Sequence, residues 1–258
     1  MKMNDLSVKH LISINDLETN DLNTIFKTAE SFKEIINRPI KKVPTLRDIT
    51  IANLFFENST RTKLSFELAE KRLSADVINF SASSSSVKKG ETLIDTVNNI
   101  LAMKVDIVVI RHPDAGAASF LSKNISASVV NAGDGSHEHP TQALLDSFSI
   151  IEKIKNIKGK NILLLGDIRH SRVALSNIFC LKKLGANVRV CGPPTLIPRD
   201  ISDLGVEVSF NCLKTHERSG SRRRSLWRRR VHLHGHTSRP GAAFSWRVHP
   251  GFLGELCF

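Results

Sequence analysis

The stretch ITIANLFFENSTRT, residues 49–62, decides how this chain folds. Its first half, Ile49 to Phe56, is rich in the β-branched and aromatic residues that strands favour. Asn58, Ser59 and Thr60 are of the types that cap helix starts, and the apolar residues after them recur at spacings of three and four. The sequence therefore predicts a strand that leads through a short turn into a helix.

The expected turn is also a candidate anion site. A strand that leads into a helix directs free backbone N–H groups, and the positive end of the helix dipole, at one point. Residues 59–62, Ser-Thr-Arg-Thr, add hydroxyls and a guanidinium that can bind two phosphate oxygens at once. An ordinary capped helix with a surface arginine would have the same local sequence, so these residues alone leave both interpretations open.

Strand-like and helix-like segments alternate from about residue 10 to residue 210. This alternation is typical of an α/β fold, and the length of 258 residues suits two domains. We expect two mainly parallel sheets, each flanked by helices, with the second domain truncated. Ligands bind such sheets at the carboxyl ends of the strands, where the segments FENSTRT, RHP and GDGSHEHP each follow a predicted strand. One pocket could therefore collect all three segments.

Composition and charge limit the function classes. The hydrophobic content of 41% and charged content of 24% are those of a soluble globular protein, and neither a membrane-length apolar run nor a signal peptide is evident, so we expect a cytoplasmic location. The four cysteines are irregularly spaced and are interpreted as free thiols without a metal site. Residues 213–258 contain ten Lys and Arg against two Asp and Glu, a net charge of +8, which leaves +4 for the preceding 212 residues. A mildly basic body suits an enzyme with anionic substrates.

Four separated motifs, taken in order and spacing, closely resemble the catalytic chains of aspartate carbamoyltransferases, within the aspartate/ornithine carbamoyltransferase superfamily. They are FENSTRT (56–62), SASSSSVKKGET (81–92), VVIRHP (108–113) and NAGDGSHEHPTQ (131–142). The resemblance covers about residues 5–210. It implies a carbamoyl phosphate-binding domain over residues 1–140 and a partial aspartate-binding domain over residues 141–211. It also implies carbamoyl transfer from carbamoyl phosphate to L-aspartate in pyrimidine biosynthesis, without a metal or other cofactor.

The resemblance implies a role for each residue of the first half-site. Arg61 would stabilise the phosphate leaving group, His139 would polarise the carbamoyl oxygen as a neutral imidazole, and Gln142 would contact the carbamoyl amide. No catalytic role is assigned to Asp134, and His137 is interpreted as incidental. The complete predicted carbamoyl phosphate set is Ser59, Thr60, Arg61, Thr62, Arg111, His139 and Gln142.

The resemblance also implies a homotrimer with shared active sites. Ser85 and Lys89 would enter the site of the neighbouring subunit, with Lys89 also contacting aspartate. Arg172 would bind an aspartate carboxylate, although Arg169 competes for that assignment. Whether a regulatory chain binds remains open.

Residues 212–258 depart from the family completely. Arginine replaces lysine as the main cation, and both tryptophans lie there. We expect this tail to be disordered or an artefact of the determined sequence. The family's later aspartate-contacting arginine and glutamine, and its H-P-x-P-R segment, have no match in it. We therefore expect carbamoyl phosphate binding without normal turnover.

Two alternatives remain open. Ornithine carbamoyltransferases share S-T-R-T and H-P-x-Q, but V-K-K-G-E-T and N-A-G-D-G favour aspartate as the substrate. The second alternative is a non-catalytic RNA-binding protein that uses the Arg222–Arg224 and Arg228–Arg230 blocks. The body of the chain has no nucleic-acid-binding motif to support it.

Overall fold

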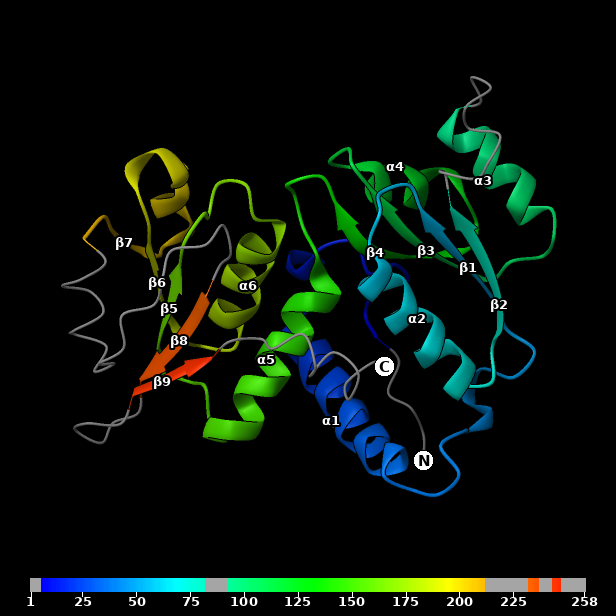
Figure 1. Ribbon diagram of the computed structural model, residues 1–258, viewed down its shortest axis with the longest axis horizontal. Helices are drawn as coiled ribbons and strands as arrows, with labels where there is room; N and C mark the ends of the chain where they lie inside the picture. Colours follow the sequence, from blue (N-terminus) through cyan, green and yellow to red (C-terminus); the bar gives the residue numbers. More distant parts are fainter. Residues whose placement is uncertain (1–5, 82–91, 212–231, 237–242, 247–258) are drawn as a thin grey trace. The chain divides into compact units, whose positions relative to one another are not determined.

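The computed structural model describes residues 6–81, 92–211, 232–236 and 243–246. The chain divides into two compact units, with the boundary between Thr141 and Gln142. Both units are layered α/β structures built on a sheet, which is the fold class predicted from the alternating segments (Figure 1).

The first unit contains a four-stranded sheet in the order β2-β1-β3-β4, and every pair of neighbouring strands is parallel. The strands are β1 (Thr50–Phe55), β2 (Asp76–Ser81), β3 (Ile107–His112) and β4 (Ser128–Asp134). The helical elements are η1 (Ile14–Asp16), α1 (Thr19–Ile36), η2 (Pro44–Leu46), α2 (Thr60–Arg72), α3 (Leu93–Leu101) and α4 (Ala117–Asn124).

Strand β1 is buried on both faces, which explains its nearly continuous apolar sequence. Ala52 and Leu54 join one core cluster with residues of α3 and α4. Ile51 and Phe55 belong to another cluster, against which Phe66 of α2 packs. The sheet therefore lies between helices, and ligands of such sheets bind at the carboxyl ends of the strands.

The first long helix follows a separate 3-10 turn. The turn is Ile14–Asp16, and α1 begins at Thr19. The reason is a capping box: the side chain of Glu18 accepts from the backbone of Asp21, and the Asp21 carboxylate accepts from the Glu18 backbone N–H at 2.8 Å. These reciprocal bonds fix Glu18 as the N-cap, so the helix begins at Thr19.

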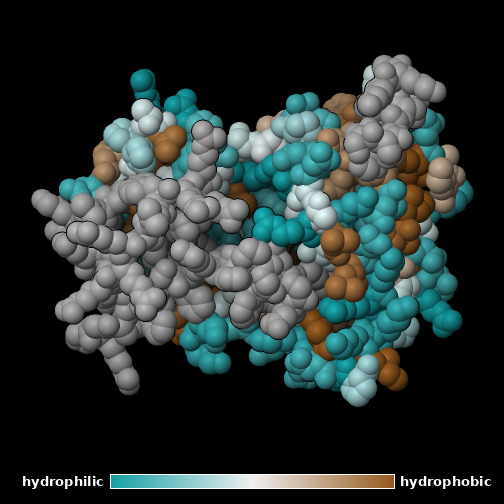
Figure 2. Space-filling model, in the orientation of Figure 1, coloured by the Kyte–Doolittle hydropathy of each residue, from teal (hydrophilic) through white to brown (hydrophobic). Residues whose placement is uncertain are grey.

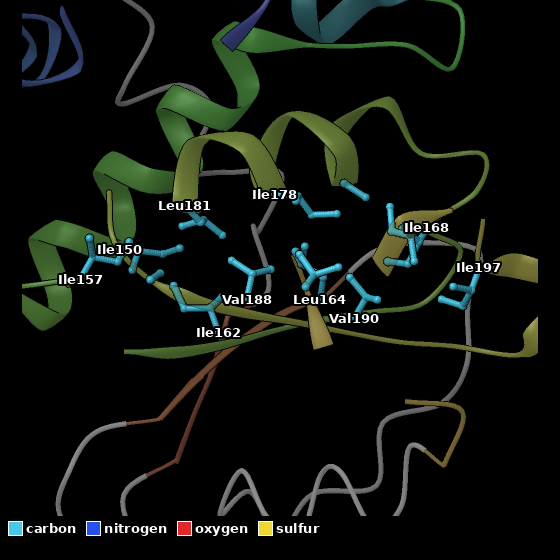
Figure 3. Packing of buried hydrophobic residues seen from close by; sticks show 14 residues of the cluster. Ile150, Ile157, Ile162, Leu164, Ile168, Ile178, Leu181, Val188, Val190 and Ile197 are labelled. Atoms are coloured by element: carbon cyan, nitrogen blue, oxygen red, sulfur yellow. The ribbon is translucent and has the colours of Figure 1, made fainter. Parts of the chain in front are cut away.

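The second unit is built on α5 (Pro140–Ile154), which starts two residues before the boundary, and on a five-stranded sheet in the order β7-β6-β5-β8-β9. The elements after α5 are β5 (Asn161–Leu165), α6 (Arg172–Lys183), β6 (Asn187–Cys191), η5 (Pro194–Leu196), η6 (Ile201–Leu204) and β7 (Glu207–Ser209). Strands β5, β6 and β7 are parallel, as predicted. Figure 3 shows the core of this unit, in which Ile178 and Leu181 of α6 lie over Leu164 and Val190 of the sheet.

Two short strands lie in the tail that was expected to be disordered or artefactual. Strand β8 (His232–His236) pairs antiparallel with β5, and β9 (Ala243–Trp246) pairs antiparallel with β8. Without β8, the edge of β5 would present unpaired N–H and C=O groups, which template the addition of a strand. Pairing with the edge of β5 thus accounts for structure where the composition predicted none.

The face of the first unit seen in Figure 2 is mostly hydrophilic, interrupted by hydrophobic residues. Leu64 and Leu68, one helical turn apart on α2, are 58% and 40% exposed. Among the described residues, no helix is long and apolar enough to cross a membrane.

Candidate active site

Three neighbouring strands of the first unit end at the same edge of the sheet. Phe55 of β1 lies beside Arg111 of β3, and His112 of β3 lies beside Asp134 of β4. Arg111 lies near the end of β3, and the segments that follow β1 and β4 hold residues 59–62 and His139. The sheet topology thus brings the three predicted segments to one edge, as the alternating pattern indicated.

The start of α2 presents backbone donors that its cap leaves uncovered. Ser59 is the N-cap residue, but its side chain makes no capping bond to the helix backbone. Its Oγ instead donates to Oγ1 of Thr62 at 2.8 Å. The first N–H groups of a helix have no partner within the helix, so the start of α2 keeps its affinity for an anion. Thr60 and Arg61 are both exposed there.

Arg111 is buried between its two neighbouring strands, with 8% of its surface exposed. Nη1 donates to the carbonyl oxygen of Ala132 in β4 at 3.1 Å, and Nη2 donates to Oε1 of Glu57 at 3.2 Å. Glu57 belongs to the turn that follows β1, so one guanidinium contacts the segments on either side. Nothing local to FENSTRT predicts this contact of Glu57 with a residue 54 positions later.

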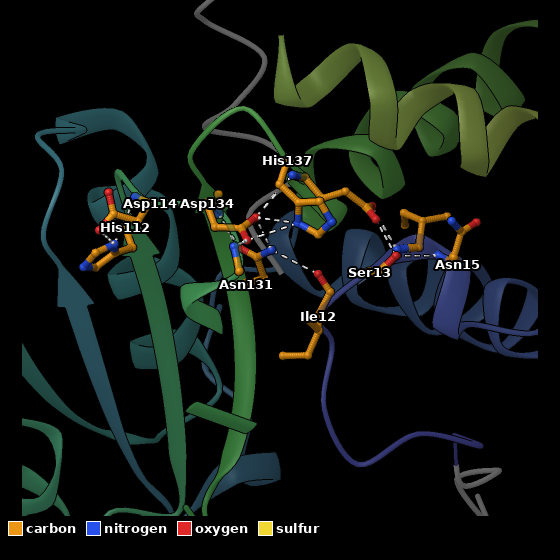
Figure 4. A network of polar contacts seen from close by, with 12 residues as sticks. Ile12, Ser13, Asn15, His112, Asp114, Asn131, Asp134 and His137 are labelled. Carbon is orange, nitrogen blue, oxygen red and sulfur yellow. Dashed lines mark hydrogen bonds and ion pairs between the residues drawn. The ribbon is translucent and has the colours of Figure 1, made fainter. Parts of the chain in front are cut away.

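The loop after β4 is organised by Asp134, which is 1% exposed. Its carboxylate accepts from the backbone N–H of Gly116 at 2.7 Å, from Nδ2 of Asn131 at 2.9 Å and from the backbone N–H of Glu138 at 3.2 Å. Nδ1 of His137 lies 3.1 Å from the same carboxylate (Figure 4). The sequence assigns no catalytic role to Asp134 and indicates only an incidental one for His137. Both hold the loop that leads to His139.

Gly135 allows the loops after β3 and β4 to touch. Its φ is +49°, and an added Cβ would lie 2.7 Å from the backbone nitrogen of Ala115 and 2.9 Å from the carbonyl oxygen of Pro113. Its N–H donates to the carbonyl oxygen of His112 at 3.0 Å. Only glycine fits this close approach of the two loops. The Asp134-Gly135 pair is the feature of the sequence that indicates a tight turn here.

Glu138 connects the same loop to the start of the chain. Its carboxylate accepts from the Ser13 hydroxyl and, at 3.1 Å, from the backbone N–H of Ile14. Leu11 pairs with β4 as an isolated parallel bridge. His139 follows directly and is 6% exposed, with its Nδ1 3.3 Å from Oγ1 of Thr141. The loop that leads to His139 is therefore anchored to the start of the chain.

His112, next to Arg111, is held in place by short contacts. Its Nδ1 accepts from the backbone N–H of Asp114 at 3.0 Å, and its ring centroid lies 5.2 Å from that of Phe56. Burial lowers its pKa, with the carboxylates of Asp114 and Asp134 opposing the shift. The neutral imidazole is consistent with Nδ1 acting as an acceptor.

The remaining predicted residues belong to the second unit or lie outside the described residues. Gln142 is on the first turn of α5, where its Nε2 donates to Asp146. Arg172 is the first residue of α6 and is partly buried, whereas Arg169 is exposed in the turn before it. Ser85 and Lys89 lie outside the described residues.

The family model for the aspartate/ornithine carbamoyltransferase carbamoyl-P binding domain matches residues 9–153. The chain is 72% identical over 211 residues to an aspartate carbamoyltransferase catalytic subunit of Christiangramia forsetii, covering 82% of this chain and 68% of that protein. It is 70% identical to the catalytic subunit of Flavobacterium johnsoniae, covering 83% and 70%.

Solved structures agree with these sequence matches. An aspartate transcarbamoylase from Trypanosoma cruzi, crystallised with carbamoyl phosphate and aspartate, superposes with a TM-score of 0.71 at 31% identity, covering 79% of this chain and 67% of that one. The catalytic subunit of M. jannaschii aspartate transcarbamoylase superposes with a TM-score of 0.68 at 40% identity, covering 78% and 67%.

Proposed function

The chain belongs to the aspartate/ornithine carbamoyltransferase family, and on that premise we propose that it transfers a carbamoyl group from carbamoyl phosphate to L-aspartate. The products are N-carbamoyl-L-aspartate and phosphate. The related Trypanosoma cruzi enzyme has been crystallised with both substrates and with carbamoyl aspartate and phosphate. The same proposal places the protein in the cytoplasm.

The observation that supports this function best is the uncapped start of α2 beside Arg111 at the end of the adjacent strand. Carbamoyl phosphate has a doubly charged phosphate group, which needs several donors and cations held close together. Residues 59–62 and Arg111 supply hydroxyls, backbone N–H groups and two guanidinium groups. Arg61 stabilises the phosphate as it leaves.

The transfer itself needs a polarised carbonyl and a positioned amine. The aspartate nitrogen forms a bond to the carbamoyl carbon, the bond from that carbon to the phosphate oxygen breaks, and the departing phosphate can take the amine proton. Negative charge develops on the carbamoyl oxygen, where His139 donates a hydrogen bond. The contacts of Asp134 and Glu138 support this role because they fix the loop before His139.

The proposed assembly is a homotrimer in which Ser85 and Lys89 act in the site of the neighbouring subunit. Leu64 and Leu68 provide an exposed apolar pair on α2 that an assembled subunit could cover. A monomer should therefore be inactive.

The proposed aspartate half-site is incomplete. Arg172 at the start of α6 would bind an aspartate carboxylate, together with Lys89 of the neighbouring subunit. Residues 213–258 contain no match to the family's later aspartate-contacting segments. We expect carbamoyl phosphate to bind and the rate at saturating aspartate to be far below that of a complete enzyme.

Calorimetry tests the two half-sites separately. Carbamoyl phosphate should bind the wild-type protein, and a bisubstrate analogue that joins a phosphonate to aspartate should bind little more tightly than carbamoyl phosphate. Absence of carbamoyl phosphate binding would refute the proposed function. An ordinary carbamoylation rate would refute the proposed impairment alone. Competition by succinate, but not by norvaline, would exclude ornithine as the natural acceptor.

A further inference from the structure

Asp146 is a buried carboxylate on α5, one helical turn after Gln142. It is 3% exposed and accepts two hydrogen bonds from side-chain amides. Nε2 of Gln142 donates to Oδ1 at 2.9 Å, and Nδ2 of Asn177 on α6 donates to Oδ2 at 2.8 Å. All three residues belong to the second unit.

This arrangement fixes which end of the Gln142 amide faces Asp146. An ionised carboxylate can only accept hydrogen bonds, so the NH₂ group of Gln142 must turn toward it. The carbonyl oxygen of Gln142 must then point away from Asp146. A free glutamine would present either end of its amide to a ligand, whereas Gln142 presents an acceptor.

We infer that Asp146 is a positioning residue that makes the site selective for a carbamoyl group, by directing the carbonyl oxygen of Gln142 at the substrate NH₂. The inference rests on the proposed function, in which Gln142 contacts the carbamoyl amide. Acetyl phosphate has the same phosphate and carbonyl groups but a methyl group in place of NH₂. A fixed acceptor left without a donor disfavours that analogue.

The ionisation of Asp146 agrees with this role at neutral and higher pH. Burial raises its pKa to about 6, while the hydrogen bonds from Asn177 and Gln142 oppose the shift. Above that pH the group is an obligate acceptor. Below it, the protonated carboxyl can donate, and the orientation of the Gln142 amide is no longer determined.

The test is the ratio of the dissociation constants of acetyl phosphate and carbamoyl phosphate, measured by calorimetry at pH 8. The wild-type ratio should be about tenfold or more. Asp146→Ala should reduce it to the ratio of Gln142→Ala. Inorganic phosphate is the control ligand, and its affinity should change by less than about threefold because neither variant touches the phosphate contacts.

The double variant Asp146→Asn with Asn177→Asp separates orientation from general packing. The new carboxylate at 177 would attract the NH₂ group of the new amide at 146, whose oxygen would then accept from Gln142. The buried charge and the side-chain volumes are conserved, so the selectivity ratio should return to within about twofold of wild type. A role for Asp146 in side-chain packing alone predicts the wild-type ratio in the single variant Asp146→Asn, which keeps the side-chain volume but removes the obligate acceptor.

A titration of the wild-type protein keeps the inference testable if Asp146→Ala does not fold. The selectivity ratio should fall at least about threefold between pH 8 and pH 5, because Asp146 becomes protonated. Three outcomes would each overturn this inference but leave the proposed function standing. They are a selectivity ratio that does not change with pH, a wild-type selectivity ratio in Asp146→Ala, and a double variant that binds phosphate normally without recovering selectivity. A wild-type protein that binds neither phosphate nor carbamoyl phosphate would overturn the proposed function, and this inference with it.

Discussion

Glu70 provides a quantitative prediction about stability. Its side chain on α2 is 4% exposed, and its Oε2 accepts from Nδ2 of Asn53 on β1 at 2.7 Å. Oε1 of Glu70 and Oδ1 of Asn53 are both buried without a hydrogen bond. A proton on Glu70 would let the acid donate to Asn53 and satisfy both atoms. Burial raises the pKa of Glu70 to about 7, reinforced by Glu67 and opposed by the Asn53 bond and by Lys71.

The sign of the pH dependence follows from the raised pKa. The folded state binds the Glu70 proton more tightly than the unfolded state does, so this contribution is complete below about pH 4.5 and is lost as the pH rises to about 7. A shift of this size corresponds to roughly 3 kcal/mol in the free energy of unfolding. Above pH 7 the curve should flatten, because both states have then released the proton.

The substitution Glu70→Gln removes the titratable proton and keeps the size and shape of the side chain. The new amide can accept from Asn53 and donate to Oδ1 of Asn53, so both buried atoms are satisfied at every pH. Urea unfolding should be followed at the transition that includes the first unit. There the free energy of unfolding of the variant should exceed that of wild type by about 2–3 kcal/mol at pH 8, and by almost nothing at pH 4.5. Glu67→Gln is the matched control on the same helix: Glu67 pairs with Lys71 at the surface, so its loss should cost under about 1 kcal/mol. An equal effect of Glu70→Gln at both pH values would refute the argument.

Three further predictions concern the candidate site. Asp134→Asn should lower kcat at least about tenfold while changing carbamoyl phosphate affinity little, because it frees the loop before His139; a loss of affinity with unchanged kcat would contradict this role. Gly135→Ala should reduce the free energy of unfolding by about 2–4 kcal/mol, because the added Cβ would lie 2.7 and 2.9 Å from backbone atoms. Denaturant titration measures this, and an unchanged midpoint would contradict it by showing that the loops separate freely. Mixing Lys89→Ala and Arg61→Ala chains should restore part of whatever activity the wild type shows, because a shared site can combine intact halves; a mixture no more active than either parent would exclude shared sites.

The parts of the fold that follow from neighbouring residues could be predicted from the sequence. The strand before FENSTRT, the helix after it and the buried strand that holds Arg111 all have local signals: apolar runs, capping residue types and periodic spacing. Parallel strands then imply a common edge for the three segments, which the strand order confirms. The family followed from the order of four motifs, and the sequence and structure comparisons confirm it.

The contacts that organise the site could not be predicted, because they join polar residues far apart in the sequence. Glu57 meets Arg111 across 54 positions, and Glu138 meets Ile14 across 124. Single polar side chains have no periodicity, so nothing in the local sequence distinguishes an organising carboxylate such as Asp134 from a surface one. Strands β8 and β9 were missed for a related reason, since they depend on the open edge of β5 rather than on their own composition.

The proposed function depends most on one feature: the start of α2 and Arg111 together form a binding site for a phosphate dianion. The most direct test is the dissociation constant of carbamoyl phosphate for Arg61→Ala and Arg111→Ala, with Arg47→Ala as the control, since Arg47 is an exposed arginine that precedes β1 at the opposite edge of the sheet. Each site variant should bind about tenfold to a hundredfold more weakly, as expected for the loss of a charge-assisted hydrogen bond, and the control should bind as wild type does. Wild-type affinity in both site variants, or equal weakening in all three, would contradict the account.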